Sequence, residues 1–299
     1  MIRTVLVPLD GSPRCEHALP LAAGVARRAG AALRLVHVRR PAAVTPGMYL
    51  EYVPSVIARE QEYLDAVARR VEQSAGLAPQ TALLDGPVVD ALAADAAAAH
   101  AGLLVLTTHG RGPFTRFWLG SVADELVRRT PVPLLVHRPH DDAPRPDLSW
   151  EPKRILVPLD GSPFGECALG PALALGRPCG AAVTLLRVIE PVPLVAPDGI
   201  VPQPTALDAA LLDELREQAE VYLSRTAERL RAEGVPVATK AVVSDLVAAA
   251  VIEEGRGHDL TAVATHARPK LARFVLGSVA DKIVRGAAGP VLVVRPDHP

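Results

Sequence analysis

The sequence repeats itself, and the repeat constrains the fold more than any other feature. Three segments of the first half return in the second half with nearly the same residues. They are VLVPLDGSP (5–13) with ILVPLDGSP (155–163), GSVADELVRR (120–129) with GSVADKIVRG (277–286), and VPLLVHRP (132–139) with PVLVVRP (290–296). Near-identity at both ends of a long segment indicates duplication, so one fold has to account for both copies.

The length and the seam between the copies indicate two domains. A chain of 299 residues exceeds the usual size of one domain. The stretch 139–153, PHDDAPRPDLSWEPK, is polar and Pro-rich and shows no apolar periodicity, which is typical of a fairly stiff linker. We therefore expect one domain over 1–139, a linker over 140–153 and a second domain over 154–296.

Strand-like and helix-like stretches alternate within each copy. In the first copy, strands are expected at 2–9, 32–38, near 80–84, at 103–107 and at 132–137, and helices at 13–28, 55–75, 88–100 and 121–130. Ser12 is suited to cap the first helix, Pro13 to its first position and Gly30 to its end. The second copy follows the same order, with an irregular stretch at 189–206. Such alternation predicts a parallel sheet with helices on both faces.

Ligands of open parallel sheets bind beyond the carboxyl ends of the strands. Thr107 and Gly110 follow the fourth strand there, and Gly120 and Ser121 open the next helix. A glycine lets backbone approach a ligand, and a helix N-terminus attracts anions, so this segment suits a phosphate. The alternative is that Ser121 only caps its helix, with Asp124 completing the capping box.

Asp10 leaves the first strand and has two interpretations of its own. Its carboxylate is suited to bond a ribose hydroxyl or to hold a divalent metal such as Mg²⁺ against phosphates. It is equally suited to bond amides within the tight Asp-Gly-Ser turn. The two roles are compatible, and the sequence leaves both open.

The opening VLVPLDGSP, the Thr-His-Gly after the fourth strand and the GSVADELVRR ending resemble the universal stress protein family over both halves. The resemblance implies two adenine nucleotide alpha hydrolase-like domains, each an α/β fold with a five-stranded parallel sheet in the order 3-2-1-4-5. It also implies pairing through the last strand. A tandem chain can make that pairing internally, through 132–137 and 291–295, and a homodimer remains compatible with it.

Nucleotide-binding members of this family carry G-x2-G-x9-G-[ST] after the fourth strand. The first copy reads Thr107-x2-Gly110-x9-Gly120-Ser121, whereas the second has Ala264 and Ala267 at the two leading positions. The resemblance therefore implies ATP, with or without Mg²⁺, and favours the first copy. It assigns ligand contacts to Pro8, Leu9, Asp10, Val38, Thr107, Gly110, Gly120, Ser121 and Val122, and in the second copy to Asp160, Val188, Ala267, Gly277, Ser278 and Val279. Asp10 would also be the metal ligand.

Composition and missing motifs narrow the function classes. Lys plus Arg number 32 and Asp plus Glu 33, which gives no electrostatic reason for a nucleic-acid partner. No signal peptide or membrane span is evident, and the three cysteines form no CxxC pair, so we expect a cytoplasmic protein whose thiols are buried and inert. No Walker motif, catalytic triad or general base stands out, which predicts at most slow ATP hydrolysis.

Two functions are consistent with these features. The first is a stress-response regulator or switch that binds ATP or another adenine nucleotide. The second is an interaction module without nucleotide, which the lost glycines at 107, 264 and 267 favour. An enzyme with one diverged catalytic copy ranks behind both.

Overall fold

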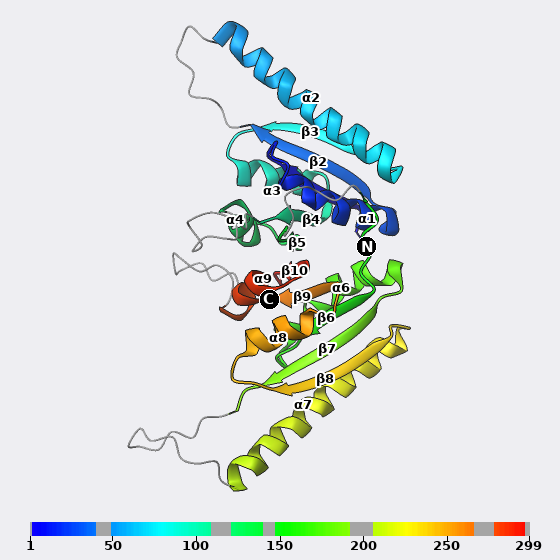
Figure 1. The fold of residues 1–299 in the computed structure, drawn as a ribbon, viewed down its shortest axis with the longest axis vertical. Helices are drawn as coiled ribbons and strands as arrows, with labels where there is room; N and C mark the ends of the chain where they lie inside the picture. The colour runs from blue at the N-terminus through cyan, green and yellow to red at the C-terminus, as the bar shows by residue number, and fades with distance from the viewer. Residues whose placement is uncertain are drawn as a thin grey trace, which may run out of the picture.

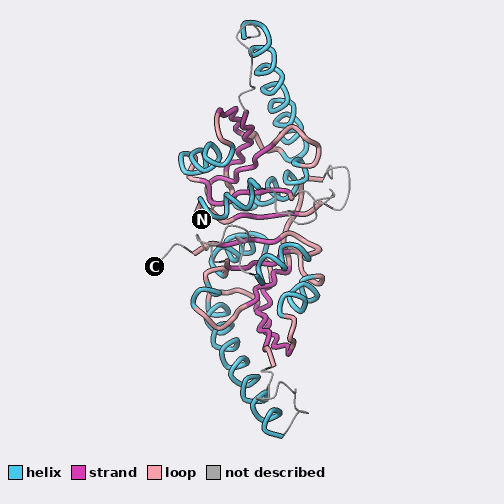
Figure 2. Tube along the Cα trace, turned by 90° about the vertical axis from the view of Figure 1, so that its left-hand side faces the viewer, coloured by secondary structure: helices cyan, strands magenta, loops and turns pink. Residues whose placement is uncertain are grey.

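The protein folds around one continuous sheet. A computed structural model describes residues 2–39, 49–108, 121–139, 147–191, 206–265 and 278–296. In this part of the chain a ten-stranded sheet has the order β3-β2-β1-β4-β5-β10-β9-β6-β7-β8. The sheet runs along the long axis of the molecule, with the long helices α2 and α7 at its opposite ends (Figures 1 and 2).

The order of elements is the same in the two halves, here called the first and the second unit. The first unit contains β1 (Thr4–Leu9), a 3-10 turn (Cys15–Ala18), α1 (Leu19–Ala29), β2 (Ala32–Arg39), α2 (Tyr49–Ala75), β3 (Gln80–Asp85), α3 (Val88–Ala98), β4 (Ala101–Thr107), α4 (Ser121–Arg129) and β5 (Leu134–His137). The second unit contains β6 (Arg154–Pro158), α5 (Pro163–Glu166), α6 (Leu169–Gly176), a 3-10 turn (Arg177–Cys179), β7 (Ala182–Ile189), α7 (Ala206–Ala232), β8 (Val237–Val243), α8 (Val247–Gly255), β9 (Leu260–Ala264), α9 (Ser278–Gly286) and β10 (Val291–Val294).

The expected fold class and strand order are confirmed. Each unit contributes five parallel strands in the order 3-2-1-4-5, and all pairings within a unit are parallel. The two sets of strands do not form separate sheets, because β5 and β10 pair antiparallel, with Leu135 opposite Leu292. Both of these leucines are fully buried. The internal pairing through the last strands therefore exists, and it covers two strand edges that would otherwise be open to another chain.

Helices cover both faces of the sheet and enclose two apolar layers. One layer packs α1 and α2 of the first unit and α6 and α7 of the second against the strands. The other layer packs α3, α4, α8 and α9 against the opposite face. Since parallel strands are buried on both sides, they read as continuous apolar runs such as Val5–Val7 and Ile155–Val157, all 0% exposed.

Some helices begin at other residues than the sequence predicted. Helix α2 begins at Tyr49 and contains Pro54, whereas the sequence suggested a start after that proline. Ser12 does not cap a helix in the first unit, because a 3-10 turn with Arg14 at its N-cap precedes α1. In the second unit the expectation holds, since Ser162 is the N-cap of α5 and accepts a hydrogen bond from Gly165 N.

The expectation of three buried thiols is wrong in part. Cys15 is buried, but Cys167 is exposed and Cys179 lies between the two. Cys167 follows the short helix α5, whose outer side faces solvent, so an apolar residue type does not ensure burial there.

The end of the linker is docked on the first unit. The backbone of Trp150 lies against Gly24 in α1, where a Cβ would overlap the Trp150 carbonyl. Glu151 forms ion pairs with Arg28 of α1 and, at 3.0 Å, with Lys153. Among the described helices, none combines the length and the apolar character needed to cross a lipid bilayer.

Candidate functional site

Asp10 begins a tight turn at the carboxyl end of β1. Gly11 adopts φ +83°, a conformation that glycine tolerates better than other residues. The turn brings the backbone N and the Oγ of Ser12 to the Asp10 carboxylate, where both donate to Oδ1 at 2.9 and 2.6 Å. The turn-bonding role considered for Asp10 is therefore present.

The second unit builds the same turn. Gly161 has φ +82°. Ser162 N and Oγ donate to Asp160 Oδ1 at 2.9 and 2.5 Å. The two bonds from Ser162 hold the Asp160 carboxylate at the edge of the sheet, where it is exposed and lines a cavity.

The structure places part of the expected site residues. Pro8 and Leu9 end β1, Val38 lies near the end of β2, Thr107 ends β4, and Ser121 opens α4 with Val122 next. Val188 lies near the end of β7, and Ser278 opens α9 with Val279 next. These positions all belong to the carboxyl edge of the sheet. Gly110, Gly120, Ala267 and Gly277 lie outside the described residues, so the expected phosphate segment stays a prediction.

Thr107 connects the two chain segments that leave β1 and β4. Its Oγ1 donates to the carbonyl oxygen of Arg14 at 3.2 Å. The side chain that replaces the first glycine of the family's pattern is thus bonded to the loop after β1. In the second unit Ala264 stands at this position and lines the cavity instead.

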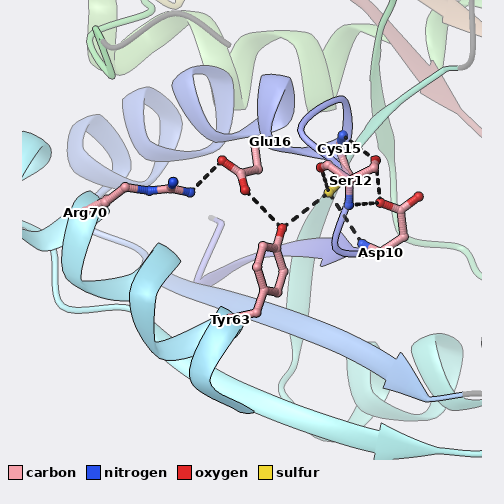
Figure 3. Close-up of polar contacts among 6 residues, drawn as sticks. All are labelled: Asp10, Ser12, Cys15, Glu16, Tyr63 and Arg70. Atoms are coloured by element: carbon pink, nitrogen blue, oxygen red, sulfur yellow. Dashed lines mark hydrogen bonds and ion pairs between the residues drawn. The ribbon is translucent and has the colours of Figure 1, made fainter. Parts of the chain in front are cut away.

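A polar cluster beside the Asp10 turn ties it to the long helix α2 (Figure 3). Glu16 is buried, and its carboxylate accepts from Tyr63 Oη at 3.1 Å and from Arg70 Nη2 at 2.5 Å. Cys15 Sγ donates to the Ser12 carbonyl at 3.0 Å and lies 3.7 Å from Tyr63 Oη. Burial raises the pKa of the Cys15 thiol to about 11, so this thiol is protonated at neutral pH.

The same cluster recurs in the second unit without the thiol. Glu166 accepts from Tyr222 Oη at 3.0 Å and from Arg229 Nη2 at 2.6 Å. Burial, followed by the hydrogen bond with Glu166, raises the pKa of Tyr222 to about 12. Gly165 takes the place of Cys15, and a Cβ there would lie 2.6 Å from Asp160 Oδ1. The carboxylate of Asp160 therefore occupies the space that a side chain at position 165 would need.

A cavity of about 720 Å³ opens at this edge of the second unit. Its walls come from the Asp160 turn, the end of β7, helix α7 and the first turns of α8 and α9. Apolar side chains such as Val188, Val251 and Ile283 make up much of the wall, and Asp160, Arg187 and Gln218 add polar groups. A mostly apolar cavity with a few polar groups, between about 300 and 1,000 Å³, is typical of a small-molecule site.

Arg187 is a site residue that the sequence reasoning missed. Its Nη1 donates to the Leu159 carbonyl at 3.3 Å, and its guanidinium lies against the turn at Gly161. The first unit has His37 at this position, with Nδ1 2.7 Å from the Leu9 carbonyl and Nε2 3.7 Å from Glu60. Comparing the second strands of the two copies residue by residue would have revealed the difference.

No cluster of three or more His, Cys, Asp or Glu side chains with metal-binding spacing occurs within the described ranges. Within these ranges a metal at Asp10 would therefore find fewer than three protein ligands of these types. If one binds, its other ligands have to come from phosphate, water or residues beyond these ranges.

These features define a doubly wound α/β protein with two equivalent units, an aspartate turn at the carboxyl edge of each unit, and a largely apolar cavity at that edge in the second. The sequence profile described as the universal stress protein family matches residues 1–138 and again 151–295. The chain belongs to the universal stress protein family and contains two of its domains in tandem.

Curated relatives carry the same family name. The universal stress protein Rv2005c of Mycobacterium tuberculosis is 34% identical over 200 residues, which is 65% of this chain and 62% of that protein. The alignment thus spans less than two thirds of that relative. A universal stress protein of Mycolicibacterium smegmatis is 28% identical over 304 residues, covering 98% of this chain and 97% of the relative.

Solved structures share the whole tandem fold. A universal stress protein from Archaeoglobus fulgidus DSM 4304 superposes with a TM-score of 0.70 at 19% identity, covering 98% of this chain and 96% of that one. The protein PA1789 from Pseudomonas aeruginosa PAO1 gives a TM-score of 0.62 at 15% identity, over 99% and 93% of the two chains. At these identities the likeness extends to the fold alone.

Proposed function

We propose that this protein is a stress-response regulator that binds ATP or another adenine nucleotide at the carboxyl edge of its sheet. The observation that carries the proposal is the cavity beside Asp160, at the position where open parallel sheets bind ligands. Nucleotide would stabilise one conformation of the protein and would not fuel rapid chemistry. The cytoplasm is the compartment proposed for it.

The lining of the cavity fits an adenine nucleotide. Val188 and Val251 offer apolar surface for a purine, and the fixed carboxylate of Asp160 is suited to a ribose hydroxyl. Val279 and Ala280 of the first turn of helix α9 line the cavity, and the dipole and N–H groups of a helix N-terminus favour phosphate.

Which unit binds more tightly is a separate proposal. The family's glycine pattern is kept better in the first unit, at Gly110 and Gly120, which favours that unit. The described cavity favours the second. Substitution of Gly120 or Gly277 by Val adds bulk at equivalent positions, so the two variants report on the two units separately. We expect Gly120→Val to weaken binding more, because its unit has lost fewer glycines.

The test starts with the ligand that copurifies. Freshly purified protein is denatured, and the supernatant is analysed for nucleotide by chromatography. ATP with Mg²⁺ is then titrated calorimetrically into ligand-free protein and into both glycine variants. Absence of nucleotide in the supernatant together with no heat on titration would refute the proposal. Equal losses in both variants would refute the asymmetry only.

The Thr107–Arg14 contact favours a second candidate for the first unit. A side chain bonded across the two loops, where the family's pattern has a glycine, narrows the approach to that site. The first unit would then be an interaction module without nucleotide. Thr107→Gly distinguishes the two, since it should create or strengthen nucleotide binding only if the threonine obstructs the site.

A further inference from the structure

The two units differ at one charged position on the wall of the candidate site. Arg187 near the end of β7 corresponds to His37 near the end of β2. The His37 ring is engaged with the Leu9 carbonyl and Glu60 on its two nitrogens and meets Tyr63 edge-on, with the ring centroids 6.4 Å apart. One ring nitrogen of His37 is therefore bonded to the backbone, and the other faces a carboxylate of the protein.

Among the described residues, Arg187 uses only a small part of its hydrogen-bonding capacity. A guanidinium has five N–H donors, and the contact with the Leu159 carbonyl uses one of them. In the part of the chain that the structure describes, no carboxylate forms an ion pair with Arg187, although the side chain is half-buried and lines the cavity. An arginine with unused donors in a cavity is suited to bind a phosphate bidentately.

Arg187 and the N-terminus of α9 line the same cavity from different sides. Along β7, Leu185 packs into the apolar layer of α6 and α7, whereas Leu186 and Val188 pack into the layer of α8 and α9. Since successive side chains of a strand point to opposite faces, Arg187 lies on the α7 side. The cavity therefore offers anion donors on two sides of the sheet edge, at α9 and at Arg187.

We propose that the second unit prefers an adenine nucleotide with two separated phosphate groups, one of them on the 2′ or 3′ oxygen of the ribose and held by Arg187. The assignment rests on the proposed function, which puts the ribose at Asp160 and the 5′-phosphate at α9. The Arg187 guanidinium contacts the turn that carries Asp160, with Nη1 3.8 Å from the place of a Cβ on Gly161. A phosphate on the ribose edge that faces Asp160 would meet this guanidinium.

The carboxylates that line the cavity make the preference for a second phosphate group depend on Arg187. Asp160 and the exposed Glu190 also line the cavity, and both disfavour a second phosphate. With Arg187 in place, a bidentate contact outweighs this repulsion and gives an advantage of about tenfold. Without Arg187 only the two carboxylates remain, so the advantage should disappear or reverse.

Calorimetric titration of the full chain tests this proposal with three probes: adenosine 5′-monophosphate, adenosine 2′,5′-bisphosphate and adenosine 3′,5′-bisphosphate. The variants are Arg187→Gln, Arg187→Lys, which keeps the charge but loses the planar fork, and Arg231→Gln as the control. Arg231 also donates to a carbonyl, that of Val237 at 2.7 Å, but does not line the cavity. Thermal unfolding of each variant shows that it is folded.

Wild-type protein and Arg231→Gln should bind one of the bisphosphates about tenfold more tightly than the monophosphate. In Arg187→Gln this ratio should fall to one or below, and Arg187→Lys should give an intermediate ratio. Binding of the monophosphate without any advantage for either bisphosphate, or an advantage that survives Arg187→Gln, overturns the inference and leaves the proposed function intact. Failure of all three probes to bind also overturns the inference, whereas the proposed function falls only if the ATP titration described above fails as well.

Discussion

Arg138 and Arg295 stand directly after the last strands of their own units and hold the last helices of the opposite units. Arg138 Nη1 donates to the carbonyl of Arg285 in α9 at 3.2 Å. Arg295 Nη1 donates to the carbonyl of Val127 in α4 at 3.4 Å and also bonds that of Arg128. The Arg-Pro pair that closes both copies of the sequence is therefore a reciprocal cap on helix C-termini, where a positive charge is favourable.

Removal of these caps should loosen the joint between the units. We expect Arg138→Ala and Arg295→Ala each to lower the free energy of unfolding by about 1 kcal/mol, because a hydrogen bond from a charged donor to a helix carbonyl is lost. Urea denaturation measures the change. Arg216→Ala serves as a control, since the Arg216–Asp213 pair at 3.6 Å is solvent-exposed and should contribute less than about 0.5 kcal/mol. Equal effects of the three substitutions would contradict the capping role.

Because the linker packs against Gly24, the stability of the protein should be sensitive to a single methyl group added at this position. Gly24→Ala would force its Cβ against the Trp150 carbonyl, so it should destabilise the protein by about 1–3 kcal/mol and change the fluorescence of Trp150. Gly170→Ala is the matched control in α6, because no heavy atom lies within 4 Å of the added Cβ. There the substitution should be neutral or stabilising by up to about 1 kcal/mol. A stable Gly24→Ala with unchanged fluorescence would show that the linker is not held there.

The cysteines should differ strongly in reactivity. Cys15 is buried with a pKa of about 11, whereas Cys167 is exposed. At pH 8, iodoacetamide should modify Cys167 within minutes and reach Cys15 only after denaturation, since the thiolate is the reactive species. Mass spectrometry of tryptic peptides gives the order, and Cys167→Ser verifies the assignment. Modification of Cys15 at a comparable rate would mean that the Tyr63 and Glu16 cluster opens readily.

The joint between α4 and α9 should respond to pH through Asp124. Burial, and to a smaller extent the charge of Asp281, raises the pKa of Asp124 above its ordinary 3.8, while Arg128 acts in the opposite direction. Because the folded state holds this proton more tightly than the unfolded chain, the contribution of Asp124 to stability is fully present below pH 3.8 and is lost as pH rises through the folded pKa.

Asp124→Asn should remove this dependence. Between pH 3.8 and neutral pH, the unfolding free energy of this variant should fall less than that of the wild type. At pH 7 the unfolding free energy of the variant should equal that of the wild type or exceed it by about a few tenths of a kcal/mol. Urea denaturation at a series of pH values measures both curves. Asp213→Asn, which changes a side chain 76% exposed, should leave the wild-type curve as it is. A steeper pH dependence in Asp124→Asn would refute this account.

The repeat and the local sequence patterns were sufficient to predict the helices and strands and their order along the chain. Apolar runs located the five strands described in the first unit, and Gly30 ends α1 in the left-handed conformation, as its place in the sequence predicted. Local signals were less reliable at the first helix. Ser12 and Ser162 both donate to the preceding aspartate, but Ser12 is followed by a 3-10 segment, whereas Ser162 caps a helix. Three residues after each of these serines the two copies differ, with Cys15 in the first and Gly165 in the second.

The candidate site was predicted only in outline. Asp10, Val38, Asp160 and Val188 lie at the carboxyl edge as expected, since strand order and direction place them there. Arg187 and Tyr222 were missed, because Tyr222 reaches the cavity from α7, far along the chain from the Asp160 turn. Neither residue belongs to a motif, so only their proximity in space marks them.

The sequence by itself determined the duplicated α/β fold and the edge at which a ligand would bind, because periodicity and chain order are local properties that survive in any conformation. The tertiary structure decided which side chains meet. It set Arg138 and Arg295 on the helices of the opposite units, placed Arg187 against the Asp160 turn and formed the cavity beside that turn. Such contacts depend on distances between residues far apart in the chain, and these distances exist only once both units have packed together.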